Sequence, residues 1–262
     1  MDRGKKTWTS GVLFALTLVI NTMGAAGWIN GLSQKEVSDK YITLITPGPG
    51  TFSIWGVIYS LLLISIIVML VKKGDMYYKK AIDKISVLFW ISCIMNTVWI
   101  VSFSLLQLGL SVIFIFGLLI TLSLILQKLR KIQEGRRFLL PLTFGLYTGW
   151  LFIAVVVNIA AWLVKLEWDR FGIPEEIWAI IMLVIAVLLV FVVLMRNRNA
   201  VFPLPVAWAY LGIYQFLNSP EGFKGQSVLL QMVSLAGMVV LIGMAAIQFY
   251  RNRFSLLPDT AE

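Results

Sequence analysis

The sequence predicts an all-α integral membrane protein with about eight transmembrane helices. Of its 262 residues, 59% are hydrophobic and only 13% are charged, and the mean hydropathy is +0.87. A chain of this composition cannot cover its apolar surface with polar side chains in water. Uncharged runs long enough to cross a bilayer recur along the chain, separated by short charged clusters. We therefore expect the chain to be surrounded by the lipid bilayer and to lie in the cell membrane.

Eight apolar segments account for that number of helices. Five are expected at about 11–31, 51–71, the two halves of 85–127, and 138–164; three more are expected at about 177–195, 200–217 and 227–250. The run 85–127 has about twice the length of one crossing and no charge, so it predicts a tight helical hairpin. The first segment follows basic residues, as a cleavable secretory signal does, but its apolar extent favours a retained helix.

The positive charges alternate along the chain as they do in a multi-pass membrane protein. Most of the 22 Lys and Arg residues fall near the N-terminus and in every second connection, including the clusters at 72–84 and 128–137. By the positive-inside rule, we expect both the N- and C-termini in the cytoplasm. This pattern explains the net charge of +9 without a nucleic-acid partner. We also expect every charged side chain to lie in a loop or tail.

The missing residue types disfavour several classes of function. The chain has no histidine, and its single cysteine, Cys93, lies inside an apolar run. We therefore expect no metal site. Without charges inside the spans, ion-coupled pumping is disfavoured. The sequence also has no phosphate-binding loop, zinc-ligand spacing or nucleophile elbow, so we expect no catalytic residue and no resident cofactor. These absences leave open whether the protein is an enzyme.

Aromatic and amide side chains form one-sided stripes on three of the predicted helices. The stretch 46–59, TPGPGTFSIWGVIY, is a stiff Pro- and Gly-containing segment followed by three aromatic residues at helical spacing. Ordinary helix packing and interfacial tryptophans explain such residues singly, whereas together they are typical of a pocket for a flat apolar molecule. The predicted ligand-binding residues are Phe52, Trp55, Tyr59, Asn96, Trp99, Trp150, Ala154 and Asn158, with Pro47 and Pro49 in a loop cap.

Three motifs in these segments resemble the TspO/MBR family, the tryptophan-rich sensory or translocator proteins, and especially its longer bacterial and plant branch. The motifs are Phe-Ser-Ile-Trp-Gly at 52–56, Asn-x-x-Trp at 96–99, and a Trp, Ala, Asn, Trp ladder at 150–162. The resemblance implies a TspO-like five-helix membrane core over residues 1–165. It implies a three-helix membrane extension with a short cytoplasmic tail over residues 166–262. The sequence departs from the family pattern in the Phe52–Trp55 spacing and in the place of Pro141.

The resemblance also implies a bundle that is often a homodimer, a cap formed by the loop between the first two helices, and porphyrins among the ligands. We accordingly expect a membrane receptor or carrier for a flat hydrophobic molecule, with a tetrapyrrole as the first candidate, acting in stress-related sensing or transport. Because no histidine can ligate a haem iron, a metal-free porphyrin is favoured. The alternatives are a light-dependent porphyrin-degrading membrane enzyme and a scaffold subunit of a membrane complex.

Overall fold

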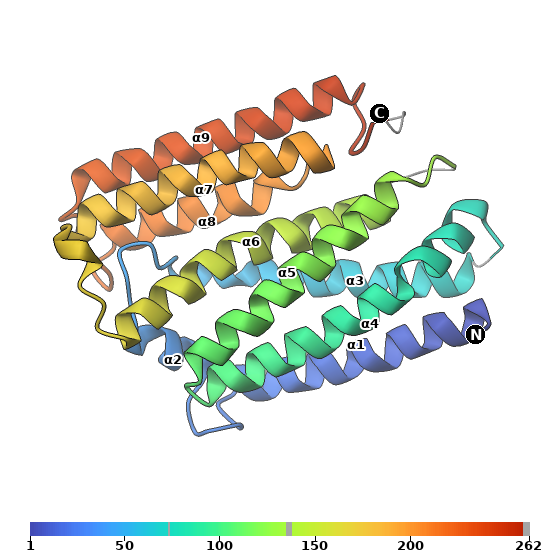
Figure 1. Ribbon diagram of the computed structural model, residues 1–262, viewed down its shortest axis with the longest axis horizontal. Coiled ribbons are helices and arrows are strands. Elements are labelled where there is room, and N and C mark those ends of the chain that lie inside the picture. Colours follow the sequence, from blue (N-terminus) through green and yellow to red (C-terminus); the bar gives the residue numbers. More distant parts are fainter. Residues whose placement is uncertain (73, 135–137, 259–262) are drawn as a thin grey trace.

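The computed structural model describes residues 1–72, 74–134 and 138–258, and in this part of the chain the regular structure is entirely helical (Figure 1). Lys73, Arg136 and Arg137, which contribute to the predicted charge pattern, and the end of the predicted tail, 259–262, lie outside the described residues. The helices are α1 (Arg3–Ala25), α2 (Gln34–Lys40), η1 (Pro49–Ser53), α3 (Ile54–Val71), α4 (Met76–Ser104), α5 (Leu108–Arg130), α6 (Leu139–Lys165), η2 (Arg170–Gly172), α7 (Glu175–Asn197), α8 (Pro203–Asn218) and α9 (Val228–Arg251).

The long helices form two neighbouring groups. Figure 1 shows α1 and α3–α6 together, with α7, α8 and α9 along one side, and it shows the start of α1 and the end of α9 at the same end of the bundle. Seven segments of the described chain are long and apolar enough to cross a membrane, η1 and α3 forming one of them. The predicted seventh span corresponds to α8, which has 16 residues and is not among the seven. At 1.5 Å per residue, α8 is about 24 Å long, shorter than a typical hydrocarbon core.

The predicted hairpin in the run 85–127 is present, as α4 and α5 joined by a three-residue turn at 105–107. Leu106 has a left-handed backbone with φ of 60°, and the Gln107 N–H donates a hydrogen bond to the Ser102 carbonyl at 2.9 Å. The turn reverses the chain within three residues, which places α4 and α5 side by side.

The prediction that every charged side chain lies in a loop or tail is wrong. Helix α1 begins at Arg3 and α4 begins at Met76, so both helices start within clusters that we had assigned to tails and loops. Asp83 on α4 pairs with Arg3 at 2.6 Å and with Lys6 at 3.0 Å. Opposite charges on adjacent helices thus satisfy each other, which lets both helices extend beyond their apolar segments.

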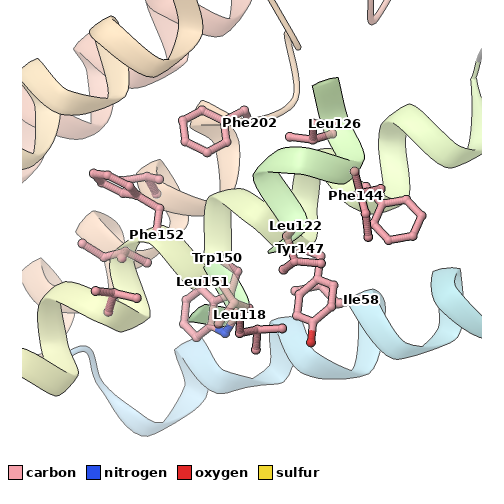
Figure 2. Packing of buried hydrophobic residues seen from close by; sticks show 14 of the residues in the cluster. Ile58, Leu118, Leu122, Leu126, Phe144, Tyr147, Trp150, Leu151, Phe152 and Phe202 are labelled. Atoms are coloured by element: carbon pink, nitrogen blue, oxygen red, sulfur yellow. The ribbon is translucent and has the colours of Figure 1, made fainter. Parts of the chain in front are cut away.

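Helix α6 is the most extensively buried of the candidate spans and forms the centre of the molecule. Figure 2 shows Tyr147 and Trp150 pointing from α6 toward α3, whereas Phe152 points toward the chain segment that carries Phe202. The Phe152 and Phe202 rings meet edge to face, 6.0 Å apart. Helix α6 therefore packs against α3 on one side and against α8 and the segment before it on another.

Glycines on α6 let the C-terminal part of the chain approach closely. A Cβ atom at Gly149 would lie only 2.2 Å from the Phe202 carbonyl oxygen, so a side chain does not fit there. One turn earlier, the Asn199 side chain packs against Gly145 and donates a hydrogen bond to the Pro141 carbonyl at 2.9 Å. This contact fixes the chain before α8 against the core, and α8 follows from it.

Candidate functional site

A cavity of about 380 Å³ is bounded by α2, the loop before η1, and the helices α3, α4 and α6. Its walls are mostly aromatic and small apolar side chains. The residues that line it include Phe52, Trp55, Trp99, Phe103, Trp150, Ala154 and Asn158, with Pro47 and Pro49 on the loop, Gln34, Lys35 and Asp39 on α2, and Phe216 on α8. All the predicted site residues except Tyr59 and Asn96 are therefore brought together at one cavity.

The aromatic walls are held by ring contacts centred on Trp55. The Trp55 ring stacks on Tyr59 with centroids 5.1 Å apart, and it meets Trp150 edge to face at 6.1 Å. Trp99 lies 6.0 Å from Trp55, and Phe52 meets Trp150 at 5.9 Å and 90°. Each such pair contributes about 0.5–1.5 kcal/mol beyond the burial of its area. The rings therefore support one another in position.

The loop before α3 sets the place of Phe52. Pro49, which we predicted to lie in the loop cap, begins η1, and residues 51–53 of this 3₁₀ helix were expected to start an α-helix. A 3₁₀ turn is tighter than an α-turn, so Phe52 does not share the helical phase of Trp55 and Tyr59. Phe52 still reaches Trp150 on α6, and the three aromatic residues of the motif join one cluster.

Tyr59 and Asn96 lie outside the cavity lining, in a hydrogen-bond network that joins four helices. The Tyr59 hydroxyl donates to the Asn21 amide oxygen at 2.8 Å, and the Asn21 amide nitrogen donates to Asn96 at 2.7 Å. Asn96 in turn donates to the Tyr147 hydroxyl at 3.0 Å. Asn96 is fully buried. This network connects α1, α3, α4 and α6 behind the aromatic wall.

Both polar groups of the Asn158 side chain form hydrogen bonds within the protein. Its amide oxygen accepts hydrogen bonds from the Trp99 indole nitrogen at 3.3 Å and from the Ser111 hydroxyl at 2.9 Å. Its amide nitrogen donates to the Ala154 carbonyl at 3.1 Å. Asn158 therefore orients Trp99 at the cavity wall.

Trp150 differs from Trp99 because its indole nitrogen has no acceptor among the described residues. The Trp150 side chain is only 2% exposed and lines the cavity. A buried N–H group without an acceptor is costly, since the protein has removed it from water without replacing the hydrogen bond. Trp150 therefore combines an unpaired donor with a side chain that lines the cavity.

Charge enters the site only at its rim, on α2. None of the buried polar side chains in the described part of the chain is Asp, Glu, Lys or Arg. Lys35 forms an ion pair with Asp39 one turn along α2, and both side chains line the cavity. The hydrogen bond and charge of Asp39 raise the pKa of Lys35 above its usual range. The cavity thus has mostly apolar walls and an ion pair at its edge.

Sequence reasoning missed α2, which the prediction treated as an irregular linker. The helix starts with a capping box: Ser33 accepts a hydrogen bond from the Glu36 N–H, and Glu36 accepts one from the Ser33 N–H. Hydrogen bonds from the Ser33 backbone and hydroxyl lower the pKa of Glu36 below its ordinary 4.5. The Ser-x-x-Glu spacing is a known signature of a helix start and could have identified α2.

A second cavity, of about 310 Å³, lies between the end of α6 and α7. Trp168 and Trp178 meet there with ring centroids 4.9 Å apart. Both lie near helix ends, where tryptophans at a membrane interface are common. Its lining also includes the acidic residues Glu167, Asp169 and Glu175 and the basic residue Arg170.

The fold and the site together define an α-helical, multi-pass membrane protein with a buried aromatic cavity. A family model described as TSPO-like protein matches residues 7–247, which include almost all the helices. The chain belongs to this family, as the sequence motifs indicated. Neither the curated proteins nor the solved structures yield a match to the chain.

Proposed function

We propose that the protein is a membrane receptor or carrier that binds a flat hydrophobic small molecule in the aromatic cavity. One observation supports this function above the others: the buried indole N–H of Trp150 has no acceptor in the described chain, and the Trp150 side chain lines that cavity. The volume of about 380 Å³ is within the range of small-molecule sites. Aromatic rings and one free donor suit a planar molecule that carries an acceptor.

The first candidate ligand is a metal-free porphyrin. Its ring would pack against Trp55, Trp99 and Trp150, and an acidic group at its edge would lie near Lys35. The absence of histidine from the sequence disfavours iron ligation. The family resemblance supports the same class of ligand, in stress-related sensing or transport.

A tryptophan fluorescence titration with protoporphyrin IX in detergent tests this function. We expect saturable quenching for the wild-type protein and about 3- to 10-fold weaker binding for Trp150→Phe, which keeps a ring and removes the donor. Trp8→Phe is the matched control, because Trp8 is 66% exposed and distant in sequence from the site segments. If the wild-type protein shows no saturable quenching, or if Trp150→Phe binds as tightly as Trp8→Phe, the proposal is wrong.

A second candidate function is light-dependent degradation of the bound porphyrin. It is favoured by the presence of two contacting tryptophans, Trp55 and Trp150, at the same cavity wall. Illumination in air should then bleach the porphyrin absorbance faster with the wild-type protein than with the Trp55→Phe/Trp150→Phe double variant. Equal bleaching rates under matched occupancy would leave binding as the function.

We further propose that both termini face the cytoplasm of the cell, in the cell membrane. The charge pattern supports this orientation, and the start of α1 and the end of α9 lie at the same end of the bundle (Figure 1). In a Cys93→Ala background, a membrane-impermeant maleimide should label Trp28→Cys but not Lys131→Cys in intact cells. Labelling of Lys131→Cys but not of Trp28→Cys would show that the orientation is the opposite of the one proposed.

A further inference from the structure

The cap loop, residues 46–53, is fastened to α8 by two hydrogen bonds. The Gly48 N–H donates to the Gly212 carbonyl at 3.1 Å. The Trp208 indole nitrogen donates to the Thr51 carbonyl at 2.9 Å. The other hydrogen bonds that involve side chains or turns of this loop stay within residues 43–51. Apart from the helix that follows it, α8 is therefore the element to which the described cap loop is hydrogen-bonded.

Close packing accompanies these hydrogen bonds. A Cβ atom at Gly212 would lie 1.9 Å from the Thr51 hydroxyl oxygen and 2.8 Å from the Thr51 Cβ atom. Thr51 itself is only 4% exposed. The absence of a side chain at Gly212 is thus what allows the cap loop to lie directly on α8.

Helix α8 also reaches the cavity. Phe216, one turn after Gly212, lines the cavity and packs against Gly48 of the cap loop. One face of α8 therefore holds the cap loop in place and supplies part of the cavity wall.

We propose that α8 latches the cap loop over the aromatic cavity, with Gly212 and Trp208 as positioning residues. The C-terminal extension is then part of the ligand site, and opening of the cap requires the two hydrogen bonds to α8 to break. The importance of this latch for ligand exchange rests on the proposed function, whereas the latch itself can be tested without any ligand.

The test measures access to a thiol placed inside the cavity. Ala154→Cys, in a Cys93→Ala background, introduces the thiol at a residue that lines the cavity. We expect a small maleimide to react on the order of tenfold faster or more when Gly212→Ala is added, because the added methyl group forces Thr51 off α8. The matched control is Gly243→Ala on α9, where an added Cβ meets no atom within 4 Å.

Two further variants keep the test informative if Gly212→Ala folds poorly. Adding Thr51→Gly to Gly212→Ala removes the overlapping side chain but keeps both hydrogen bonds, since the cap loop contributes only backbone atoms to them, and it should restore slow labelling. Trp208→Phe removes only the N–H donor and should speed labelling by about 3- to 10-fold. Unchanged labelling in both Gly212→Ala and Trp208→Phe, or equal acceleration by Gly243→Ala, would overturn the latch.

The same proteins separate failure of the latch from failure of the proposed function. Faster labelling in Gly212→Ala supports the latch even if protoporphyrin IX does not quench the tryptophan fluorescence of the wild-type protein. In that case only the ligand assignment fails. Conversely, protoporphyrin IX could quench the tryptophan fluorescence of the wild-type protein while labelling stays unchanged in Gly212→Ala and Trp208→Phe. That result would support the binding function and overturn the latch.

Discussion

Asn21 on α1 donates a hydrogen bond to Asn96 on α4 across 2.7 Å, and the side chain of Asn96 is fully buried. Because Asn96 also donates to Tyr147, its amide uses both oxygen and nitrogen to join three helices. In a membrane protein, where lipid competes with helix–helix packing, such polar contacts specify which helix faces meet.

Replacement of Asn96 by alanine should destabilise the bundle. The change leaves the Tyr147 hydroxyl without its donor and Asn21 without one acceptor, so we expect a loss of about 1–3 kcal/mol in the free energy of unfolding. Reversible unfolding in mixed detergent micelles measures this loss. Asn30→Ala is the control, since Asn30 is exposed and its hydrogen bond is long, at 3.5 Å. Equal stability of the two variants would contradict the role of the network.

Gly149→Ala should weaken the contact between the core and the C-terminal helices. The added Cβ atom would lie 2.2 Å from the Phe202 carbonyl, which is backbone and cannot rotate away, so we expect a loss of about 1–3 kcal/mol or more. Gly56→Ala on α3 meets no atom within 4 Å and should be neutral or stabilising by up to about 1 kcal/mol. The midpoints of thermal unfolding of the two variants measure this difference. A Gly149→Ala midpoint at or above that of Gly56→Ala would refute the predicted loss of stability.

The cation at the rim should favour acidic porphyrins. We expect Lys35→Met to bind protoporphyrin IX about two- to fivefold more weakly, a small loss because an exposed charge contributes little binding energy. The variant should bind the uncharged dimethyl ester as tightly as the wild-type protein does. Lys40→Met, on the same helix but outside the cavity lining, should affect neither ligand. Fluorescence titrations with both ligands measure the difference, and an equal loss for acid and ester would exclude a charge interaction.

The start of α2 should respond to acid. Because the folded-state pKa of Glu36 is below 4.5, its contribution to the capping box is fully present above that pH and is lost as the pH falls through the lower folded value. The Ser33 amide proton shift, followed by NMR, should therefore titrate with a midpoint below 4.5. Glu36→Gln keeps an acceptor for the cap and should abolish the titration. A midpoint above 4.5 in the wild-type protein would show that the capping box does not stabilise the ionised form of Glu36.

Local sequence patterns were sufficient to predict most of the long helices and eight of the residues that line the cavity. The uncharged run 85–127 required a hairpin, and the ladder from Trp150 to Asn158 lies on one face of α6 because those residues recur every three to four positions. The beginnings of α1 and α4 were not predicted, since the pairing of Asp83 with Arg3 and Lys6 depends on the two helices being adjacent.

The part of the site that could not be predicted comes from distant segments. No spacing in the sequence indicates that Phe216 lies beside Gly48, or that Asn96 turns toward Asn21 and Tyr147 rather than into the cavity. Both depend on how the helices pack, which a stripe on a single helix does not encode. The indole nitrogen of Trp150 likewise differs from that of Trp99 only because Asn158 lies near one of them.

The separation of Thr51 and Trp208 also has a consequence for biosynthesis. The two residues are 157 positions apart, and ribosomes add about 5–20 residues per second, so the cap loop exists for about 8–30 s before its partner helix is made. The five helices that surround the cavity are complete only when α6 ends at Lys165, so for about the last 2–9 s of that interval they hold an open cavity with an unfastened cap. A hydrophobic pigment or lipid present during translation could thus enter the site before the chain is finished and be enclosed when α8 arrives.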